Sequence, residues 1–272
     1  MRFKKFIPTS ILAKIKISKR QKFVFSALFL SFGLLVIQWG NPSWRYVVIG
    51  FLAIFTYLLS SWSLKEGLGG VEWFTVLALP TLFTAGVGLF YFLVPARWAT
   101  HLPVIILYGI GIYGLLLTEN IFSVAAIRTI QLLRAAQAVG FLLTLVTGFF
   151  LYDTILSFRL EFWHNFWLIF VVSLPLMLQG LWSINLEEKI TFRLWFYSFA
   201  LSLVLAELGL VFSFWPVTVV VGSLVLTTVF YITLGLAQHD LSERLFSRTI
   251  NEYLSVGLTV MAVILLTTHW GG

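Results

Sequence analysis

The chain has 272 residues, of which 60% are hydrophobic and only 11% are charged, and its formal net charge is +7. Soluble domains carry about 25% charged residues, so this composition excludes an ordinary soluble protein and is typical of a chain that faces lipid. Cysteine is absent from the sequence, which excludes disulfides, thiolate metal sites and thiol catalysis.

The net positive charge comes from the first 22 residues. They hold eight Lys and Arg residues and no acid, which leaves ten basic against eleven acidic residues in the rest of the chain. Isoleucines and a leucine alternate with these lysines, as in helices that lie on a membrane surface. We therefore expect segment 1–22 to be a basic amphipathic cytoplasmic segment that binds anionic headgroups, at about 1 kcal/mol per basic side chain. Nucleic acid is the other usual partner of a basic tail, and the interleaved apolar residues argue against it.

The rest of the sequence predicts an all-α polytopic transmembrane bundle. A helix needs about 20 apolar residues to cross the hydrocarbon of a bilayer. Nine runs of roughly that length are present, at 23–39, 44–64, 73–94, 102–118, 138–158, 162–184, 194–214, 216–236 and 254–270. No small-residue cleavage site follows the first run, so we expect it to be a retained span rather than a secretory signal.

The loop charges predict the orientation. Apart from segment 1–22, the loops on the N-terminal side carry seven Lys and Arg residues and the loops on the opposite side carry three. Positive charge collects on the cytoplasmic side of membrane proteins, so we expect the N-terminus inside and the C-terminus outside. The chain is interpreted as an integral protein of a bacterial-type cytoplasmic (inner) membrane.

Two stretches outside the predicted spans are amphipathic. In 119–137, Arg128, Gln131 and Arg134 are three residues apart, with apolar side chains between them. The stretch 240–253 opens with Asp240 and Glu243, which resembles a capping box at the start of a helix. We expect both stretches to be cytoplasmic interfacial helices.

Short motifs recur about 120 residues apart, which indicates an internal duplication. Trp62-Ser63-Leu64 returns as Trp182-Ser183-Ile184, and the Ala, Gly, Leu and Pro of 85–95 return at 206–216. The predicted organisation is 4+4+1 spans in parallel copies. The segments are 1–22, a first four-span repeat at 23–118, an interfacial helix with a second repeat at 119–236, and an interfacial helix with the ninth span at 237–272. Chance similarity between apolar segments is the alternative.

Ionisable residues inside spans are the candidate functional residues, because each costs about 2.5–3.5 kcal/mol on insertion scales. Asp153 and Glu207 are the clear cases, and His164 and Asn165 open the following span near the outer surface. In the alignment of the two copies, Gln38 corresponds to Asp153 and Gly86 corresponds to Glu207.

We hypothesise that Asp153, Glu207 and His164 border a polar cavity open to the outside, with Asn165 and Gln38 on the same pathway. A carboxyl group there suits proton binding or acid–base catalysis. The alternative is that each carboxyl group fixes helix packing through a hydrogen bond. The histidines do not have metal-ligand spacing, and no glycine-rich phosphate-binding loop is followed by Lys, so no metal site and no cofactor are expected.

Three functions remain open, and the sequence favours a small permease or ion-coupled carrier, because of the parallel copies and the two acids within spans. The second function is that of a membrane-embedded enzyme that acts on a lipid or envelope precursor at the outer face, with Asp153, His164 and Glu207 as catalytic residues. A non-catalytic scaffold or assembly protein is the third, and short loops with few polar residues in the spans support it.

Overall fold

The computed structural model of the protein describes residues 18–37, 44–95, 97–126 and 131–268. Within these residues it contains nine α-helices, all long and apolar enough to span a membrane. They are α1 (Lys19–Ile37), α2 (Arg45–Leu64), α3 (Glu72–Tyr91), α4 (Trp98–Ala125), α5 (Leu133–Ser157), α6 (Phe162–Asn185), α7 (Phe192–Phe212), α8 (Val219–Leu241) and α9 (Ser247–Thr267). The predicted all-α architecture with nine apolar helices is confirmed. Gln38 and most of segment 1–22 lie outside the described residues.

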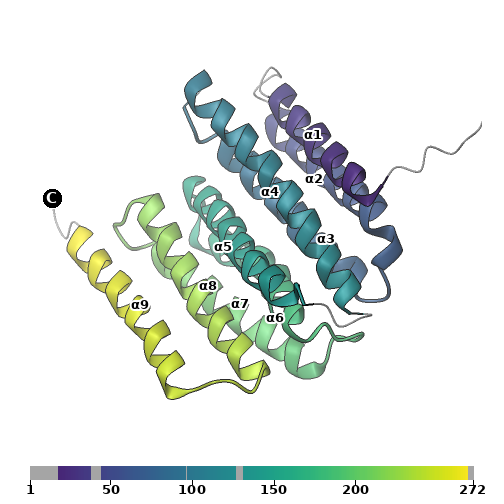
Figure 1. The fold of residues 1–272 in the computed structure, drawn as a ribbon. Coiled ribbons are helices and arrows are strands. Elements are labelled where there is room, and N and C mark those ends of the chain that lie inside the picture. The colour runs from purple at the N-terminus through teal and green to yellow at the C-terminus, as the bar shows by residue number, and fades with distance from the viewer. Residues whose placement is uncertain (1–17, 38–43, 96, 127–130, 269–272) are drawn as a thin grey trace, which may run out of the picture.

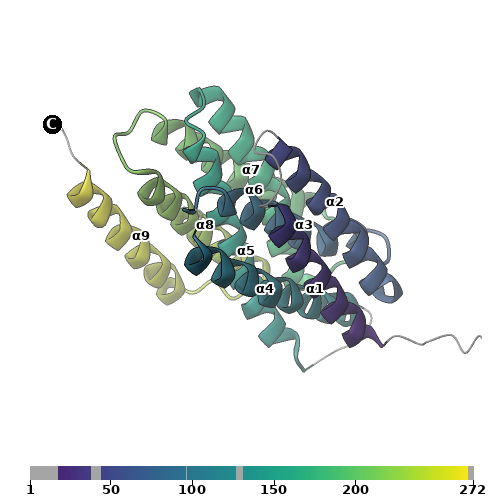
Figure 2. The same cartoon turned by 90° about the horizontal axis from the view of Figure 1, so that it is seen from above.

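The helices run side by side, and short loops make consecutive helices antiparallel (Figures 1 and 2). The loops after α1, α3, α5 and α7 therefore gather on one face, and those after α2, α4, α6 and α8 gather on the other. We name them the outer face and the inner face, after the predicted orientation. Large apolar side chains such as Phe51, Ile110 and Leu266 are exposed along the helices, which is compatible with contact to lipid.

The helices form two four-helix groups with the same internal pairings. In the first half α1 packs on α2 and α4, and α3 packs on α2 and α4. In the second half α5 packs on α6 and α8, and α7 packs on α6 and α8. Helix α9 packs on α8 at the edge of the bundle, where it is coloured yellow in Figure 1.

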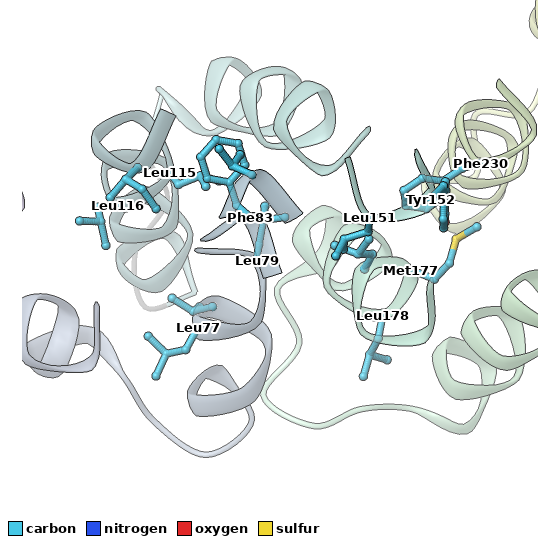
Figure 3. Packing of buried hydrophobic residues seen from close by; sticks show 14 of the residues in the cluster. Leu77, Leu79, Phe83, Leu115, Leu116, Leu151, Tyr152, Met177, Leu178 and Phe230 are labelled. Atoms are coloured by element: carbon cyan, nitrogen blue, oxygen red, sulfur yellow. The ribbon is translucent and has the colours of Figure 1, made fainter. Parts of the chain in front are cut away.

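The two halves meet along a seam in which α3 and α4 pack on α5, and α3 also packs on α6. Small residues allow the close approach. A Cβ at Gly86 would come within 3.2 Å of the Leu151 side chain, and one at Gly140 would come within 3.1 Å of the Phe122 ring. Buried apolar side chains fill both sides of the seam (Figure 3), and Leu79 and Leu151 are among them. The seam is therefore a tightly packed contact.

The prediction of two interfacial helices is wrong. Residues 119–125 are the last turns of α4, and Leu133 already begins α5, so 119–137 is not one element. Asp240 lies in the last turn of α8, where its carboxylate pairs with Arg193 at 2.7 Å and accepts the Tyr197 hydroxyl at 2.8 Å. Asp240 therefore binds a neighbouring helix, whereas Gln131, Arg134 and Arg244 are exposed at a helix end or in a loop.

The duplication remains a prediction, and one packing contact is common to both halves. In the first half, a Cβ at Gly88 of α3 would meet Ile49 of α2 at 3.2 Å. In the second half, a Cβ at Gly209 of α7 would collide with Ile169 of α6. The two glycines are 121 positions apart and the two isoleucines are 120 apart, so the contact recurs at the offset of the sequence repeat.

The orientation can be tested because the natural chain has no cysteine. We expect Glu161→Cys, in the loop between α5 and α6, to react with a membrane-impermeant maleimide in intact cells, because that loop lies on the outer face. The control Glu188→Cys, in the loop between α6 and α7, should react only after permeabilisation. The reverse labelling would invert the orientation.

Candidate functional site

Asp153, the first residue selected from the sequence, is buried in the second half. Its side chain lies on α5, with 4% of the residue exposed, and the Ser223 hydroxyl of α8 donates a hydrogen bond to Oδ1 at 3.0 Å. A carboxyl group in such a place fixes the packing of α5 on α8, and it is also available to exchange a proton.

Asp153, Glu207 and His164 do not meet. Glu207 is exposed on the surface of α7, a helix that packs on α6 and α8 and faces away from the seam with the first half. His164 is exposed on α6, and its Nδ1 lies 4.0 Å from a carboxylate oxygen of Glu161. The common cavity that we hypothesised for these three side chains is therefore not formed by the described residues. Both the enzyme and the carrier that would use Asp153 and Glu207 together lose this support.

Asn165 lines a pocket on the outer face of the second half. The pocket holds about 440 Å³ and is lined by Leu156, Arg159, Leu160, Asn165, Phe212, Ser213, Val217, Thr218, Val219 and Gly222. Asn165 is 3% exposed, and its Nδ2 donates to the Ser213 hydroxyl at 2.9 Å. Its Oδ1 is buried and has no partner among the described residues. We call this cavity the outer pocket.

The outer pocket lies next to Asp153. Leu156 of the pocket is one helical turn beyond Asp153 on α5. On α8, Gly222 lines the pocket, and its neighbour Ser223 makes the hydrogen bond to Asp153. Two of the five side chains selected from the sequence, Asp153 and Asn165, are thus brought to one region of the second half.

Sequence reasoning missed the most enclosed carboxyl group, that of Glu119. It lies on α4, at the seam, and its exposed fraction is 0%. The Gln179 side chain of α6 donates from Nε2 to Glu119 Oε1 at 3.0 Å, and the Thr144 hydroxyl of α5 lies 3.3 Å from Gln179 Oε1. Helices of both halves therefore meet at one polar group of three side chains, which we call the seam cluster.

The other carboxyl oxygen of Glu119, Oε2, is buried and has no partner among the described residues. None of the ion pairs that the described residues form includes Glu119. An unpaired carboxylate is costly in a dry interior, so this group calls for a proton or a cation as its partner. The seam cluster is the strongest candidate for an ion-binding or proton-binding site.

One signal could have found Glu119. The predicted fourth span ends at residue 118, because the polar run Thr118-Glu119-Asn120 interrupts the apolar sequence. Three apolar residues, Ile121, Phe122 and Val124, follow this run, and α4 continues through it to Ala125. A carboxyl group with apolar residues on both sides is a candidate functional residue on the same grounds as Asp153.

A second pocket lies on the inner face and is lined by both halves. It holds about 370 Å³ between Glu66, Gly67, Leu68, Gly69, Gly70, Glu72, Ala126 and Glu188. Glu66 pairs with Lys19 at 3.0 Å, and Glu72 accepts the Gly69 backbone N–H at 2.6 Å. Ala126 follows α4 directly, seven residues beyond Glu119, or about 10 Å along the helix. We call this cavity the inner pocket.

Helix α6 connects these features. Asn165 near its start lines the outer pocket, Gln179 belongs to the seam cluster, and Glu188 just after its end lines the inner pocket. Pro175 lies between Asn165 and Gln179, and it has no N–H to donate to the carbonyl group one turn back. A proline inside a helix is a common place for a kink.

Within the described part of the chain, no three His, Asp or Glu side chains are grouped so as to hold a metal ion. The described residues provide one enclosed carboxyl group at the seam and two pockets on opposite faces.

The seam cluster gives a stability prediction. We expect Gln179→Leu to lower the free energy of unfolding by about 1–3 kcal/mol, because it leaves the buried Glu119 carboxyl group without its donor. The double variant Glu119→Leu with Gln179→Leu should recover most of the loss, since both polar groups are then gone. Denaturant or thermal unfolding of the purified protein in detergent measures this. Glu207→Leu is the matched control, because its carboxyl group is exposed and it should not destabilise the protein. Losses that simply add in the double variant would contradict the coupling.

Comparison with known proteins gives one match. No curated protein and no solved structure matches the chain. A family model described as "Protein of unknown function (DUF5656)" matches residues 47–267, which run from the start of α2 to the end of α9. This match covers most of the chain and includes the seam cluster and both pockets, so the protein belongs to the DUF5656 family.

Proposed function

We propose that the protein is a small carrier that moves a polar solute across the membrane, and that Glu119 takes up and releases a proton during the cycle. One observation carries the proposal. Glu119 is fully enclosed at the seam between two helical groups, with one carboxyl oxygen unpartnered among the described residues. Ionisable residues at such positions mark proton and ion pathways in transporters.

The two pockets support this proposal, because a carrier needs an access route from each face. The inner pocket is lined by loops of both halves, and its three carboxylates, Glu66, Glu72 and Glu188, favour the approach of cations and protons. The outer pocket opens among α5, α6, α7 and α8. The carrier would work in a bacterial-type cytoplasmic membrane, with the inner pocket facing the cytoplasm.

Movement along the seam is the step that the proposal requires. Alternating access in carriers built from repeats is largely a rocking of one repeat against the other around a fixed site. Here the seam cluster joins α4 of the first half to α5 and α6 of the second half. Protonation of Glu119 changes the charge of the seam. The two arrangements of the halves therefore bind the proton with different affinities, and proton binding shifts the equilibrium between them.

Cysteine accessibility in proteoliposomes tests this proposal. We place one cysteine in the outer pocket (Val219→Cys) or in the inner pocket (Leu68→Cys) and measure its labelling rate in acidic and in alkaline buffer. Each rate is divided by that of a small reference thiol in the same buffer, because the thiolate fraction itself rises with pH. Coupling free energies in proteins correspond to at least about a five-fold effect, so we expect a change of that size, with opposite signs at the two positions.

Two background variants give this measurement its controls. Glu119→Gln should make both normalised labelling rates independent of pH, because the titrating group of the protein is gone. Glu207→Gln, a matched change at an exposed carboxyl group, should leave the pH dependence intact. The proposal fails if labelling responds to pH equally with and without the Glu119 carboxyl group.

A second function, assembly with another membrane protein, is favoured by Glu207. Its carboxyl group is exposed in α7, within a segment whose other exposed side chains include Val204 and Val211. A carboxyl group directed at lipid is costly, so a partner helix that supplies a polar group at this depth would remove the penalty.

Site-specific cross-linking tests this second function. We expect a photoreactive phenylalanine analogue at Val204 or Val211 to cross-link a membrane protein in cells, and Glu207→Leu to reduce the product several-fold. The same analogue at Ile110, an exposed position on α4, serves as the control. Cross-linking to lipid alone at all three positions would exclude a partner on this face.

A further inference from the structure

We infer that the outer pocket binds the headgroup of a phospholipid, and that it selects headgroups that carry both a phosphate and an N–H or O–H donor, as ethanolamine and glycerol headgroups do. This inference depends only on the outer pocket. It does not depend on proton exchange at Glu119, so either can fail without the other.

The first observation is positive charge without a fixed counter-ion. Arg159 is the only charged residue that lines the outer pocket, it is exposed, and it forms no ion pair with the described residues. Its backbone has φ 48°, a left-handed conformation that ends α5 and turns the chain toward α6. A guanidinium group in such a cavity is suited to a phosphate, which it can bind through two parallel N–H bonds.

The start of α8 adds donors on another wall of the same pocket. Thr218 is the N-cap residue of this 23-residue helix, and both Thr218 and Val219 line the pocket. The first N–H groups of a helix have no partner within the helix, and the helix dipole adds positive potential there. An anion in the outer pocket therefore meets a side-chain cation from α5 and backbone donors from α8.

The second and independent observation is Asn165. It is 97% buried, it lines the pocket, and its Nδ2 is occupied by the Ser213 hydroxyl at 2.9 Å. The Ser213 hydroxyl in turn donates to the Gly209 carbonyl oxygen at 3.1 Å, which fixes the direction of this chain of hydrogen bonds. The Asn165 Oδ1 is left as a buried acceptor without a partner among the described residues. Such an acceptor requires a donor, so the ligand must offer an N–H or O–H group as well as its phosphate.

The depth of the pocket favours a lipid over a soluble phosphoester. The outer pocket lies at the ends of the spanning helices, beside Trp163 and Phe214, which are 56% and 68% exposed. Exposed aromatic residues at helix ends mark the headgroup level of a bilayer. The apolar part of the lining, which includes Leu156, Phe212 and Val217, suits the carbon atoms that connect a phosphate to its acyl chains.

Lipid retention by the purified protein tests the inference. We load delipidated protein with mixed micelles of phosphatidylethanolamine, phosphatidylglycerol and phosphatidylcholine and count the bound lipids by native mass spectrometry. The choline headgroup carries a phosphate but has no N–H or O–H donor. We expect it to be retained about ten-fold less well than the other two, the ratio that one lost hydrogen bond to a buried group gives.

Two variants of the pocket, each with a control, assign this selectivity to it. Arg159→Gln should lower the retention of all three lipids by about ten-fold, since each has a phosphate, whereas Arg97→Gln, at another outer loop, should change nothing. Asn165→Leu should abolish the preference over phosphatidylcholine. Ser213→Ala removes the same hydrogen bond to Asn165 but keeps Oδ1, so it should retain the preference and separates loss of the acceptor from loss of local packing.

Competition with soluble compounds identifies the source of the headgroup. Glycerol phosphate and phosphoethanolamine, which have the same polar groups without acyl chains, should displace the lipids only at much higher concentration. Equal retention of all three lipids by the natural protein, or undiminished retention by Arg159→Gln, would overturn the site. Tight binding of the soluble phosphoesters to delipidated protein would exclude a lipid as the ligand and assign the pocket to a soluble solute.

Discussion

A carboxyl group enclosed between the two halves of the bundle is the constraint on which the rest of this structure depends. Glu119 is fully buried, and its one hydrogen bond, from Gln179, crosses the seam. Gly86 and Gly140 allow close packing along the seam, and a closely packed interior of low dielectric constant strengthens that hydrogen bond and also raises the penalty for an unpaired charge. A single hydrogen bond between side chains therefore joins the two halves at this buried carboxyl group.

The spans could be predicted because they depend on a property that each residue has by itself. Hydropathy summed over a helix length is large in all nine runs, and the helices formed as expected. The interfacial helix expected from residue 240 onward could not be predicted correctly, because its first polar residue has its partners elsewhere in the chain. Asp240 is polar because Arg193 and Tyr197 of α7 bind it, and local amphipathicity does not reveal whether a polar group meets water or a neighbouring helix.

The site could be predicted only in part for the same reason. The sequence selects Asp153 and Glu207 because they lie inside predicted spans and passes over Glu119 because it follows a predicted span end, whereas the surroundings of all three depend on which side of each helix meets another helix. Asp153 faces α8, Glu207 faces outward, and Glu119 faces the seam. That information resides in the packing of the helices. An apolar surface is suited to lipid and to protein alike, so the sequence alone does not distinguish the two.

The two halves share packing contacts but not polar groups, and this difference indicates where the chemistry lies. The contact of Gly88 with Ile49 recurs as that of Gly209 with Ile169. In contrast, the first half holds a chain of hydrogen bonds from Thr56 to Thr84 at 2.9 Å and on to Tyr108 at 3.0 Å, whereas Leu176 and Leu205 stand at the positions of the two threonines one repeat later. That chain satisfies its own members. Among the described residues, the buried oxygens without a hydrogen-bond partner include Glu119 Oε2 at the seam and Asn165 Oδ1 in the second half. Since a buried acceptor without a donor is costly, a proton at the first atom and a ligand donor at the second would each stabilise the protein. A scaffold that is the same in both halves can hold the helices in place, and the polar groups that only one half has can then serve binding.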